Sequence, residues 1–284
     1  MNEEYKGKLA ALGAASLWGI NAIAVRYLFN IGINVTTILF FNAVFGAIFI
    51  LLFRHKINFK PGLKRLRLIS IVGILGLLNG SLMLYAIKYT KIAIAEFLHF
   101  TMPAWAFIIA VFFLKEKVGK WRILALITSL TGVALVFDIN LLRNGFEITN
   151  IGNILALISA FIYATQTSIA RKLEVNGYTT TFWISAISIP IIFPFYIFNN
   201  SRGSVSDIIL IGMIAVFVVI SALILYYYSM TKVQVTKVSI ILLFELVLAS
   251  ILAWIIFKES LNTLNIIGGL LILASSAILI IKKK

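Results

Sequence analysis

The sequence predicts an all-α polytopic membrane protein with ten transmembrane helices and both chain ends in the cytoplasm. Three observations predict this fold class: an extreme apolar composition, ten apolar segments of spanning length, and a basic excess that collects in alternate loops. Of the 284 residues, 61% are hydrophobic and only 12% are charged, whereas soluble globular domains are roughly 45–50% apolar and about 25% charged. This composition excludes intrinsic disorder, and the absence of cysteine excludes a disulfide scaffold and thiolate chemistry.

Ten segments are long and apolar enough to cross a bilayer, whose hydrocarbon core of about 30 Å requires about 20 residues of helix. The connections between them are short, so we expect no soluble domain in any loop. The first segment lacks the cleavage site of a signal peptide, so we expect it to be retained. In chain order the predicted spans are 9–29, 35–53, 66–86, 92–114, 121–138, 151–171, 180–198, 207–229, 236–257 and 263–281.

The distribution of Lys and Arg predicts the orientation of these spans. The chain has 25 basic and 10 acidic residues, a formal net charge of +15. If the N-terminus is cytoplasmic, 19 basic residues fall in inner segments and 5 in outer ones, and Arg26 lies within the first span. Cytoplasmic loops are enriched in Lys and Arg, so this split favours both chain ends inside. The basic excess is thereby explained by topology, and we expect no nucleic-acid partner.

The two halves of the chain resemble each other. The similar segments are 12–28 with 157–173, 84–91 with 225–232, and 113–116 with 256–259. They occur in the same order at offsets of 141 to 145 residues, which predicts two five-helix repeats, residues 1–145 and 146–284. Because five is odd, the second repeat should cross the membrane in the opposite direction, the inverted arrangement of many secondary transporters.

Several short motifs carry a family resemblance. They are SLWGIN at Ser16–Asn21, the Tyr-x4-Thr element at Tyr85–Thr90, Pro103, FLKE at Phe113–Glu116, FEL at Phe244–Leu246 and FKE at Phe257–Glu259. In their order and spacing the chain resembles the drug/metabolite transporter superfamily, in its ten-helix branch of two EamA-type repeats. The sequence departs from that pattern at Asn42, where the family often has Arg, and at Leu246, where Pro commonly follows the glutamate. The resemblance implies export of amino acids, other metabolites or drugs, with some members moving nucleotide-sugars, and peripheral fifth and tenth helices.

Three ionisable residues lie deep in predicted spans, where a charge costs about 2.5–3.5 kcal/mol on insertion scales. Glu245 is near the middle of the ninth span, while Glu96 and His99 lie one turn apart in the fourth. We expect Glu245 and Glu96 to be candidates for proton or ion coupling, and His99 to face the substrate. The alternative for each is a buried or interfacial residue that is satisfied by its neighbours. Pro103, one turn further along, predicts a kink.

Uncharged polar and aromatic residues complete the expected substrate cavity. The first and sixth spans each place an aromatic residue and an amide one turn apart, and the same face of the sixth span includes Ser159. The alternatives are interfacial aromatics and amides that only bond a neighbouring helix. With His99, the predicted substrate-binding residues are Trp18, Asn21, Asn79, Tyr85, Tyr163, Gln166 and Tyr226.

The sequence favours a transporter over an enzyme. No phosphate-binding lysine loop, HExxH motif or G-x-S-x-G elbow is present, so we expect no cofactor and no metal. We expect a multi-pass protein of the cell membrane that exports a small metabolite, foremost an amino acid, by alternating access, with proton coupling left open. The alternatives are a nucleotide-sugar or drug carrier, an intramembrane enzyme, and a passive channel. Expected partners are the solute and the lipid bilayer, and a monomer is compatible with the sequence.

Overall fold

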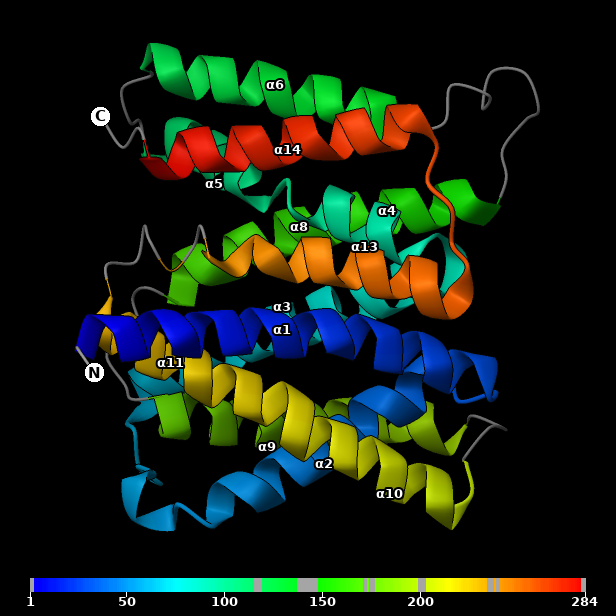
Figure 1. The fold of residues 1–284 in the computed structure, drawn as a ribbon. Coiled ribbons are helices and arrows are strands. Elements are labelled where there is room, and N and C mark those ends of the chain that lie inside the picture. The colour runs from blue at the N-terminus through cyan, green and yellow to red at the C-terminus, as the bar shows by residue number, and fades with distance from the viewer. Residues whose placement is uncertain are drawn as a thin grey trace.

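The computed structural model is a bundle whose helices run roughly along one common direction (Figure 1). It describes residues 3–114, 119–136, 148–170, 173, 177–198, 203–233, 238 and 241–281, and every regular element in these ranges is helical. The elements are α1 (Glu3–Asn30), α2 (Val35–Leu51), η1 (Arg54–Lys56), α3 (Leu63–Tyr89), α4 (Ile92–His99), α5 (Met102–Leu114), α6 (Lys120–Val136), α8 (Ile148–Ala170), α9 (Gly177–Ile197), α10 (Val205–Met213), the π-helical stretch η2 (Ile214–Ile220), α11 (Ser221–Lys232), α13 (Phe244–Phe257) and α14 (Thr263–Ile281).

Six helical segments in the described residues have the length and composition needed to cross a membrane. They are Glu3–Asn30, Leu63–Tyr89, Ile92–Ile109, Ile148–Ala170, Gly177–Ile197 and Val205–Lys232. Four shorter apolar helices, of 10–17 residues, are Val35–Leu51, Ile123–Val136, Phe244–Phe257 and Thr263–Ser275. Each of these helices overlaps one of the predicted spans. In Figure 1, α1 begins and α14 ends at the same end of the bundle.

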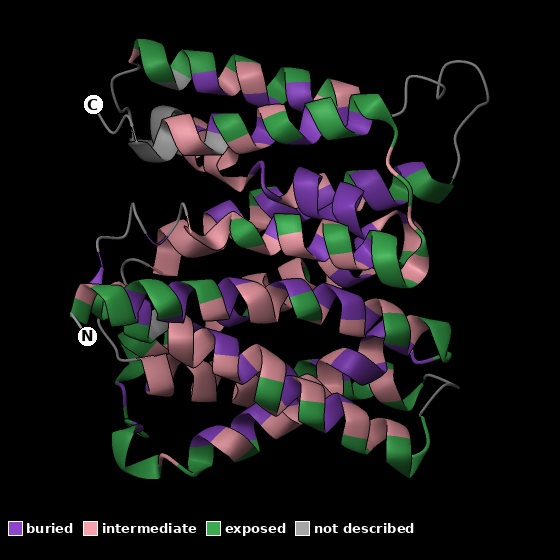
Figure 2. Ribbon diagram, in the orientation of Figure 1, coloured by how far each residue is buried: buried purple, intermediate pink, exposed green. Residues whose placement is uncertain are grey.

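The outer surface of the bundle is apolar, the reverse of a soluble protein. Large side chains such as Leu130, Trp254 and Phe198 are 58%, 62% and 86% exposed. Such a continuous apolar exterior requires a nonpolar environment, which a bilayer provides. Figure 2 shows that burial is concentrated in the middle of the bundle, above all in α4, where every residue from Ile92 to Leu98 is buried.

The helix corresponding to the predicted fourth span is divided into α4 and α5. The last backbone bond of α4 runs from the Phe100 N–H to the Glu96 carbonyl, and α5 starts at Met102. Pro103 has no N–H with which to continue the ladder to the carbonyl of His99. The Thr101 hydroxyl donates to the Leu98 carbonyl at 2.7 Å and satisfies part of the broken turn. Glu96 and His99 therefore lie on a short helix that ends beside them.

The longest interhelical contact in the middle of the bundle joins α3 and α8, which pack antiparallel. Three pairs along it are Gly76 with Gln166, Met83 with Ser159, and Thr90 with Gly152. A Cβ on Gly152 would lie 2.9 Å from both the backbone nitrogen and the Cβ of Thr90, so this crossing requires glycine. The antiparallel direction places the first helix of the second sequence repeat against the third helix of the first.

A related contact joins α1 and α11. Gly7, which the sequence repeat relates to Gly152 by the offset of 145, packs where a Cβ would lie 2.6 Å from Val233 Cγ2 and 2.7 Å from Lys232 Cβ. The two halves of the chain therefore use the same kind of glycine contact, each time between the first helix of one repeat and the third helix of the other.

The fifth and last helices of the two repeats, α6 and α14, lie side by side at one edge of the bundle (Figure 1). Their backbones cross where Gly132 faces Gly268, since a Cβ on Gly268 would lie 2.6 Å from the Gly132 carbonyl oxygen. The Ser275 hydroxyl donates to the Ala125 carbonyl at 2.7 Å across the same contact. Close packing of small residues and an interhelical hydrogen bond are typical of helix association in membranes. The peripheral position agrees with the expectation for the fifth and tenth helices.

Candidate functional site

A group of buried and half-buried polar side chains is centred on α4 and α8. The His99 Nδ1 lies 2.8 Å from the Ser159 Oγ, and the His99 ring meets the Tyr163 ring edge-on, with centroids 5.5 Å apart. Glu96, one turn before His99, is 5% exposed. We call Glu96, His99, Ser159, Tyr163 and Glu245 the His99 cluster, since α13, which carries Glu245, packs against α4.

The hydrogen bonds of Ser159 favour one tautomer of His99. The Ser159 hydroxyl lies 2.7 Å from the Ala156 carbonyl, to which it can donate its single proton. With the proton used there, the hydroxyl accepts from the imidazole, an arrangement in which the His99 Nδ1 carries a proton. In the neutral ring this leaves the lone pair on Nε2, which is the nitrogen that can take up a proton or accept a hydrogen bond from a solute.

The two glutamates of the His99 cluster come from different halves of the chain. Their helices, α4 and α13, are packed together, and Gly19 on α1 brings that helix against the backbone of Glu245, where a Cβ would lie 3.0 Å from its carbonyl oxygen. None of the salt bridges among the described residues involves Glu96 or Glu245. A carboxyl group in the apolar interior of a membrane bundle is stabilised by a proton or by a cationic partner.

Several amide oxygens of the described helices are buried without a hydrogen-bond partner. The Gln166 side chain lies against α3, with its Nε2 2.7 Å from the position of a Cβ on Gly76, one turn from Asn79. Unsatisfied acceptors in an apolar interior cost free energy unless a ligand or water donates to them. The unpartnered oxygens belong to Asn21, Asn42, Asn79, Asn153 and Gln166.

The ring contacts of the predicted substrate-binding residues occur in separate pairs. His99 and Tyr163 are in contact, whereas Trp18 lies against Tyr226, with ring centroids 5.4 Å apart. Tyr85 stacks on Tyr89, with centroids 6.1 Å apart, near the end of α3. Trp18 of α1 and Tyr163 of α8 thus each have a ring contact with an aromatic residue of another helix.

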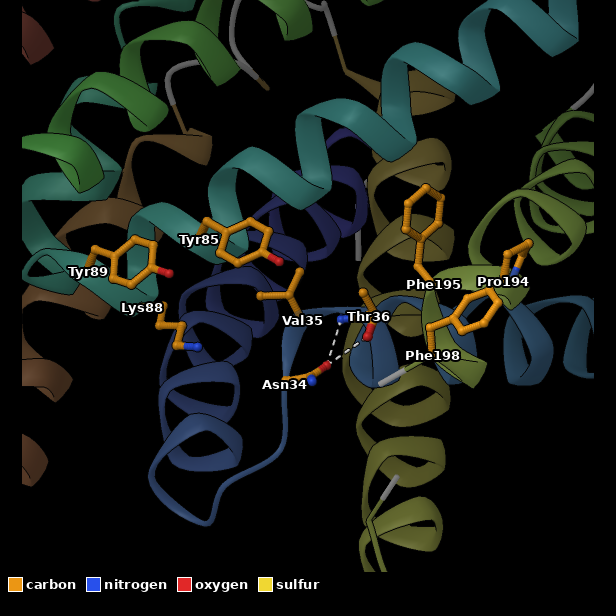
Figure 3. A pocket seen from close by; sticks show the side chains of 9 residues that line it. All are labelled: Asn34, Val35, Thr36, Tyr85, Lys88, Tyr89, Pro194, Phe195 and Phe198. Atoms are coloured by element: carbon orange, nitrogen blue, oxygen red, sulfur yellow. Dashed lines mark hydrogen bonds between the residues drawn. The ribbon is translucent and has the colours of Figure 1, made fainter. Parts of the chain in front are cut away.

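Tyr85 lines a cavity of about 560 Å³ at the end of the bundle where α2 begins. Figure 3 shows Tyr85, Lys88 and Tyr89 of α3 on one side, Pro194 and Phe195 of α9 with Phe198 just beyond its end on the other, and the start of α2 between them. The Asn34 side chain accepts from the backbone N–H of Thr36 at 3.1 Å and so caps α2. The lining residues are Asn34, Val35, Thr36, Tyr85, Lys88, Tyr89, Pro194, Phe195 and Phe198.

A second cavity of about 270 Å³ adjoins the first and shares four residues with it. It adds Leu39, Leu77, Ser81, Ile191 and Ile192. We call the two cavities together the α2–α3–α9 crevice. Its lining includes no member of the His99 cluster, so Tyr85 belongs to a different site from His99 and Tyr163.

A polar network at the same end of the bundle was not predicted as functional. Arg26 Nη1 lies 3.1 Å from Glu259 Oε1, and Arg26 also donates to the carbonyls of Ile87 and Thr90. The other carboxylate oxygen of Glu259 accepts from the backbone N–H of Ile92 at 2.7 Å, which is the first residue of α4. The sequence feature that could have indicated this network is the Lys-Glu pair after the predicted ninth span, which recurs in both halves of the chain. The partner of Glu259, Arg26, lies far away in the chain and could not be predicted.

The ionisable side chains of the described residues indicate which chemistry the site can support. Among the described residues, no group of three or more His, Asp or Glu side chains could hold a metal ion. The polar groups of the His99 cluster are proton and hydrogen-bond carriers, which can bind a solute and exchange protons with it.

Known proteins similar to this chain are transporters by name. A protein of Archaeoglobus fulgidus described as an uncharacterized transporter is 26% identical over 271 residues, 94% of each chain. Another uncharacterized transporter, from Clostridium kluyveri, is 26% identical over 74% of this chain and 70% of its own length. A solved crystal structure superposes with a TM-score of 0.64 at 15% identity, covering 97% of this chain and 98% of that one, a likeness of fold alone.

The sequence profile of the EamA-like transporter family matches the chain twice, over residues 5–138 and again over residues 150–281. The two matches correspond to the two halves expected from the internal similarity, and together they cover nearly the whole chain. The chain therefore belongs to the EamA-like transporter family of the drug/metabolite transporter superfamily.

Proposed function

We propose that the chain is a secondary transporter of the cell membrane that exports a small metabolite, foremost an amino acid, by alternating access. In this proposal ten helices cross the bilayer as two inverted repeats, residues 1–145 and 146–284, with both chain ends in the cytoplasm. The split of Lys and Arg between alternate loops supports this orientation. The matched antiparallel contacts of α3 with α8 and of α1 with α11 support the inversion.

The proposed class of substrate is inferred from the His99 cluster. It presents two carboxyl groups without a basic partner in the described salt bridges. An ammonium group satisfies such carboxyl groups, and its N–H donors also suit the unpartnered amide oxygens of Asn21, Asn79 and Gln166. A nucleotide-sugar is anionic and would be repelled by the same carboxyl groups, so the cluster favours an amine-bearing solute.

The His99 cluster also supports proton coupling. Glu96 and Glu245 lie on helices that pack together, and ionised carboxylates are costly in an apolar interior, so a proton and a cationic solute compete for these groups. Release of the proton then favours binding of the solute, and the reverse, as exchange of protons against solute requires. His99, one helical turn from Glu96, offers a position for a proton relay.

The test is solute flux in proteoliposomes with an imposed pH gradient, in which amino acids are screened first. We expect saturable flux that responds to the gradient. Glu245→Gln should lose the response while it still folds, and Glu4→Gln, which changes a glutamate at the surface end of α1, is the matched control. Wild-type flux and pH dependence in Glu245→Gln would contradict the coupling role, and no flux of any solute would favour an intramembrane enzyme.

A further inference from the structure

The α2–α3–α9 crevice is a site separate from the proposed transport pathway. It is formed by the beginning of α2 and the ends of α3 and α9, whereas the His99 cluster is formed by α4, α8 and α13. The crevice opens on the apolar exterior of the bundle, because Phe195 and Phe198 in its wall are 65% and 86% exposed. Its occupant therefore reaches it from the membrane rather than from the middle of the protein.

The two ends of the crevice differ in polarity. The wider cavity contains the ammonium of Lys88, the hydroxyl groups of Tyr85 and Tyr89, and the Asn34 amide (Figure 3). The residues that the narrower cavity adds are aliphatic apart from Ser81, whose hydroxyl donates to the Leu77 carbonyl of its own helix at 2.7 Å. A ligand that matches both ends has a polar head and an apolar tail.

The charge of the wider cavity selects an anionic head. Its lining contains Lys88 and no carboxylate, and Lys88 takes part in no salt bridge among the described residues. The Lys88 ammonium lies 5.7 Å from the centroid of the Tyr89 ring, a weak contact that leaves it able to bind an anion. The Asn34 oxygen is used in capping α2, so its amide N–H groups are the ones left to donate.

The position in the fold matches a lipid and not a soluble anion. Lys88 lies in the last turn of α3, next to two tyrosines, and Lys and Tyr at helix ends mark the level of the lipid headgroups. From that level the narrower cavity continues between α2, α3 and α9 along Leu77 and Leu39, in the direction an acyl chain takes. A water-soluble phosphate would gain nothing from this apolar extension.

We propose that the α2–α3–α9 crevice binds an anionic phospholipid, with its headgroup phosphate beside Lys88 and one acyl chain in the narrower cavity. A lipid at this position fills the space between α2, α3 and α9 and holds these helices at a fixed spacing. This binding does not depend on the identity of the transported solute.

The test is native mass spectrometry of the purified protein in micelles that contain equal amounts of phosphatidylglycerol and phosphatidylcholine. The wild type should retain one phosphatidylglycerol in preference to phosphatidylcholine. Lys88→Gln should reduce that preference about fivefold, the factor that corresponds to about 1 kcal/mol for one basic residue near an anionic lipid. Ser81→Phe should displace the lipid of either kind, because the new ring fills the narrower cavity while Lys88 is kept.

Lys258→Gln is the matched control, since Lys258 is an exposed lysine beyond the end of α13 and outside the crevice lining. It should leave the preference unchanged. Thermal melting of each variant shows that it is folded. If Lys88→Gln and Lys258→Gln lost the preference for phosphatidylglycerol equally, the preference would reflect general charge attraction, and the proposal would be overturned. Full lipid retention in Ser81→Phe would overturn it as well. Displacement of the lipid by soluble glycerol phosphate would identify an anion site without a role for the acyl chain, and would also overturn it.

Discussion

The guanidinium of Arg26, near the end of α1, lies 3.1 Å from the carboxylate of Glu259, just beyond the end of α13. This ion pair joins the first helix of one half of the chain to the fourth helix region of the other. Both side chains are largely buried, at 19% and 10% exposed. Glu259 also accepts from the Ile92 N–H, so the same carboxylate stabilises the start of α4, the helix that carries Glu96 and His99.

We expect Arg26→Gln and Glu259→Gln each to destabilise the protein by about 3 kcal/mol, because each leaves its partner buried without a counter-charge. The double variant should lose less than the sum of the single losses, since it leaves no unpaired charge. Unfolding in detergent, followed by circular dichroism, measures the three differences.

The matched control is Lys6→Gln, which removes an exposed lysine that pairs with Glu3 within α1 at 2.8 Å. An exposed pair of this kind should contribute little. If Arg26→Gln were as mild as Lys6→Gln, or if the single losses simply added, the Arg26–Glu259 contact would have no energetic significance.

The stability of Arg26→Gln should also depend on pH. Burial raises the pKa of the Glu259 carboxyl, and Arg26 is the largest of the influences that lower it. A carboxyl whose pKa is raised by folding stabilises the protein below its unfolded value of about 4.3, and this stability is lost as pH rises through the folded value. Without Arg26 the folded pKa rises further, so we expect Arg26→Gln to lose stability relative to wild type as the pH rises above the unfolded value of about 4.3 into the neutral range. A difference in unfolding free energy between Arg26→Gln and wild type that does not change with pH would show that Glu259 does not titrate in this range. The same pH dependence in the double variant, which lacks Glu259, would show this as well.

The apolar pattern of the sequence located the helices well but not their partners. Each apolar helix of the described residues overlaps a predicted span, because bilayer thickness fixes the length of an apolar run. The start of α1 at Glu3 was missed, since its first turns carry four charged residues, Glu3, Glu4, Lys6 and Lys8, that a hydropathy criterion rejects. The pairing of α3 with α8 could not be read from hydropathy, because both the lipid-facing and the packed faces of these helices are apolar.

The candidate site was predictable as a set of residues and not as an arrangement. Glu96, His99 and Tyr163 were singled out because polar groups are rare in apolar spans, and the structure brings His99 and Tyr163 into contact. Tyr85 could not be separated from them by sequence, since the position of a residue along a helix does not tell which neighbouring helix it faces. The pairing of Arg26 with Glu259 was not predictable either, because the two residues lie far apart in the chain.

Cysteine labelling will test the proposed orientation of the membrane helices. The chain has no cysteine, so a single engineered thiol reports its own position without background. Ser260→Cys, in an exposed residue after α13, should react with a membrane-impermeant maleimide in intact cells, and Lys60→Cys, between α2 and α3, should react only after permeabilisation. Reaction of Lys60→Cys alone in intact cells would reverse the orientation, and equal reaction of both would place the two loops on one side.

The crossing of α6 and α14 depends on the absence of a side chain at Gly268. A Cβ there would lie 2.6 Å from the Gly132 carbonyl oxygen and 2.9 Å from Val136 Cγ2, and backbone atoms cannot move away as a flexible side chain can. We therefore expect Gly268→Ala to separate the two helices and to destabilise the protein by about 1–3 kcal/mol, the usual cost of overpacking.

Gly80→Ala on α3 is the matched control for this crossing, because its added Cβ would meet only Leu39 Cδ2 at 3.7 Å, an ordinary contact. Since alanine favours a helix over glycine by about 1 kcal/mol, this variant should be neutral or slightly more stable than wild type. Equal melting temperatures for Gly268→Ala and Gly80→Ala would contradict the close backbone contact.

The hydrogen bond from the Ser275 hydroxyl to the Ala125 carbonyl spans the same interface. In the Gly268→Ala background this bond is already weakened, because the helices have separated. Adding Ser275→Ala to Gly268→Ala should therefore cost less stability than Ser275→Ala costs in the wild type. Full additivity of the two stability losses would show that the helices remain in place.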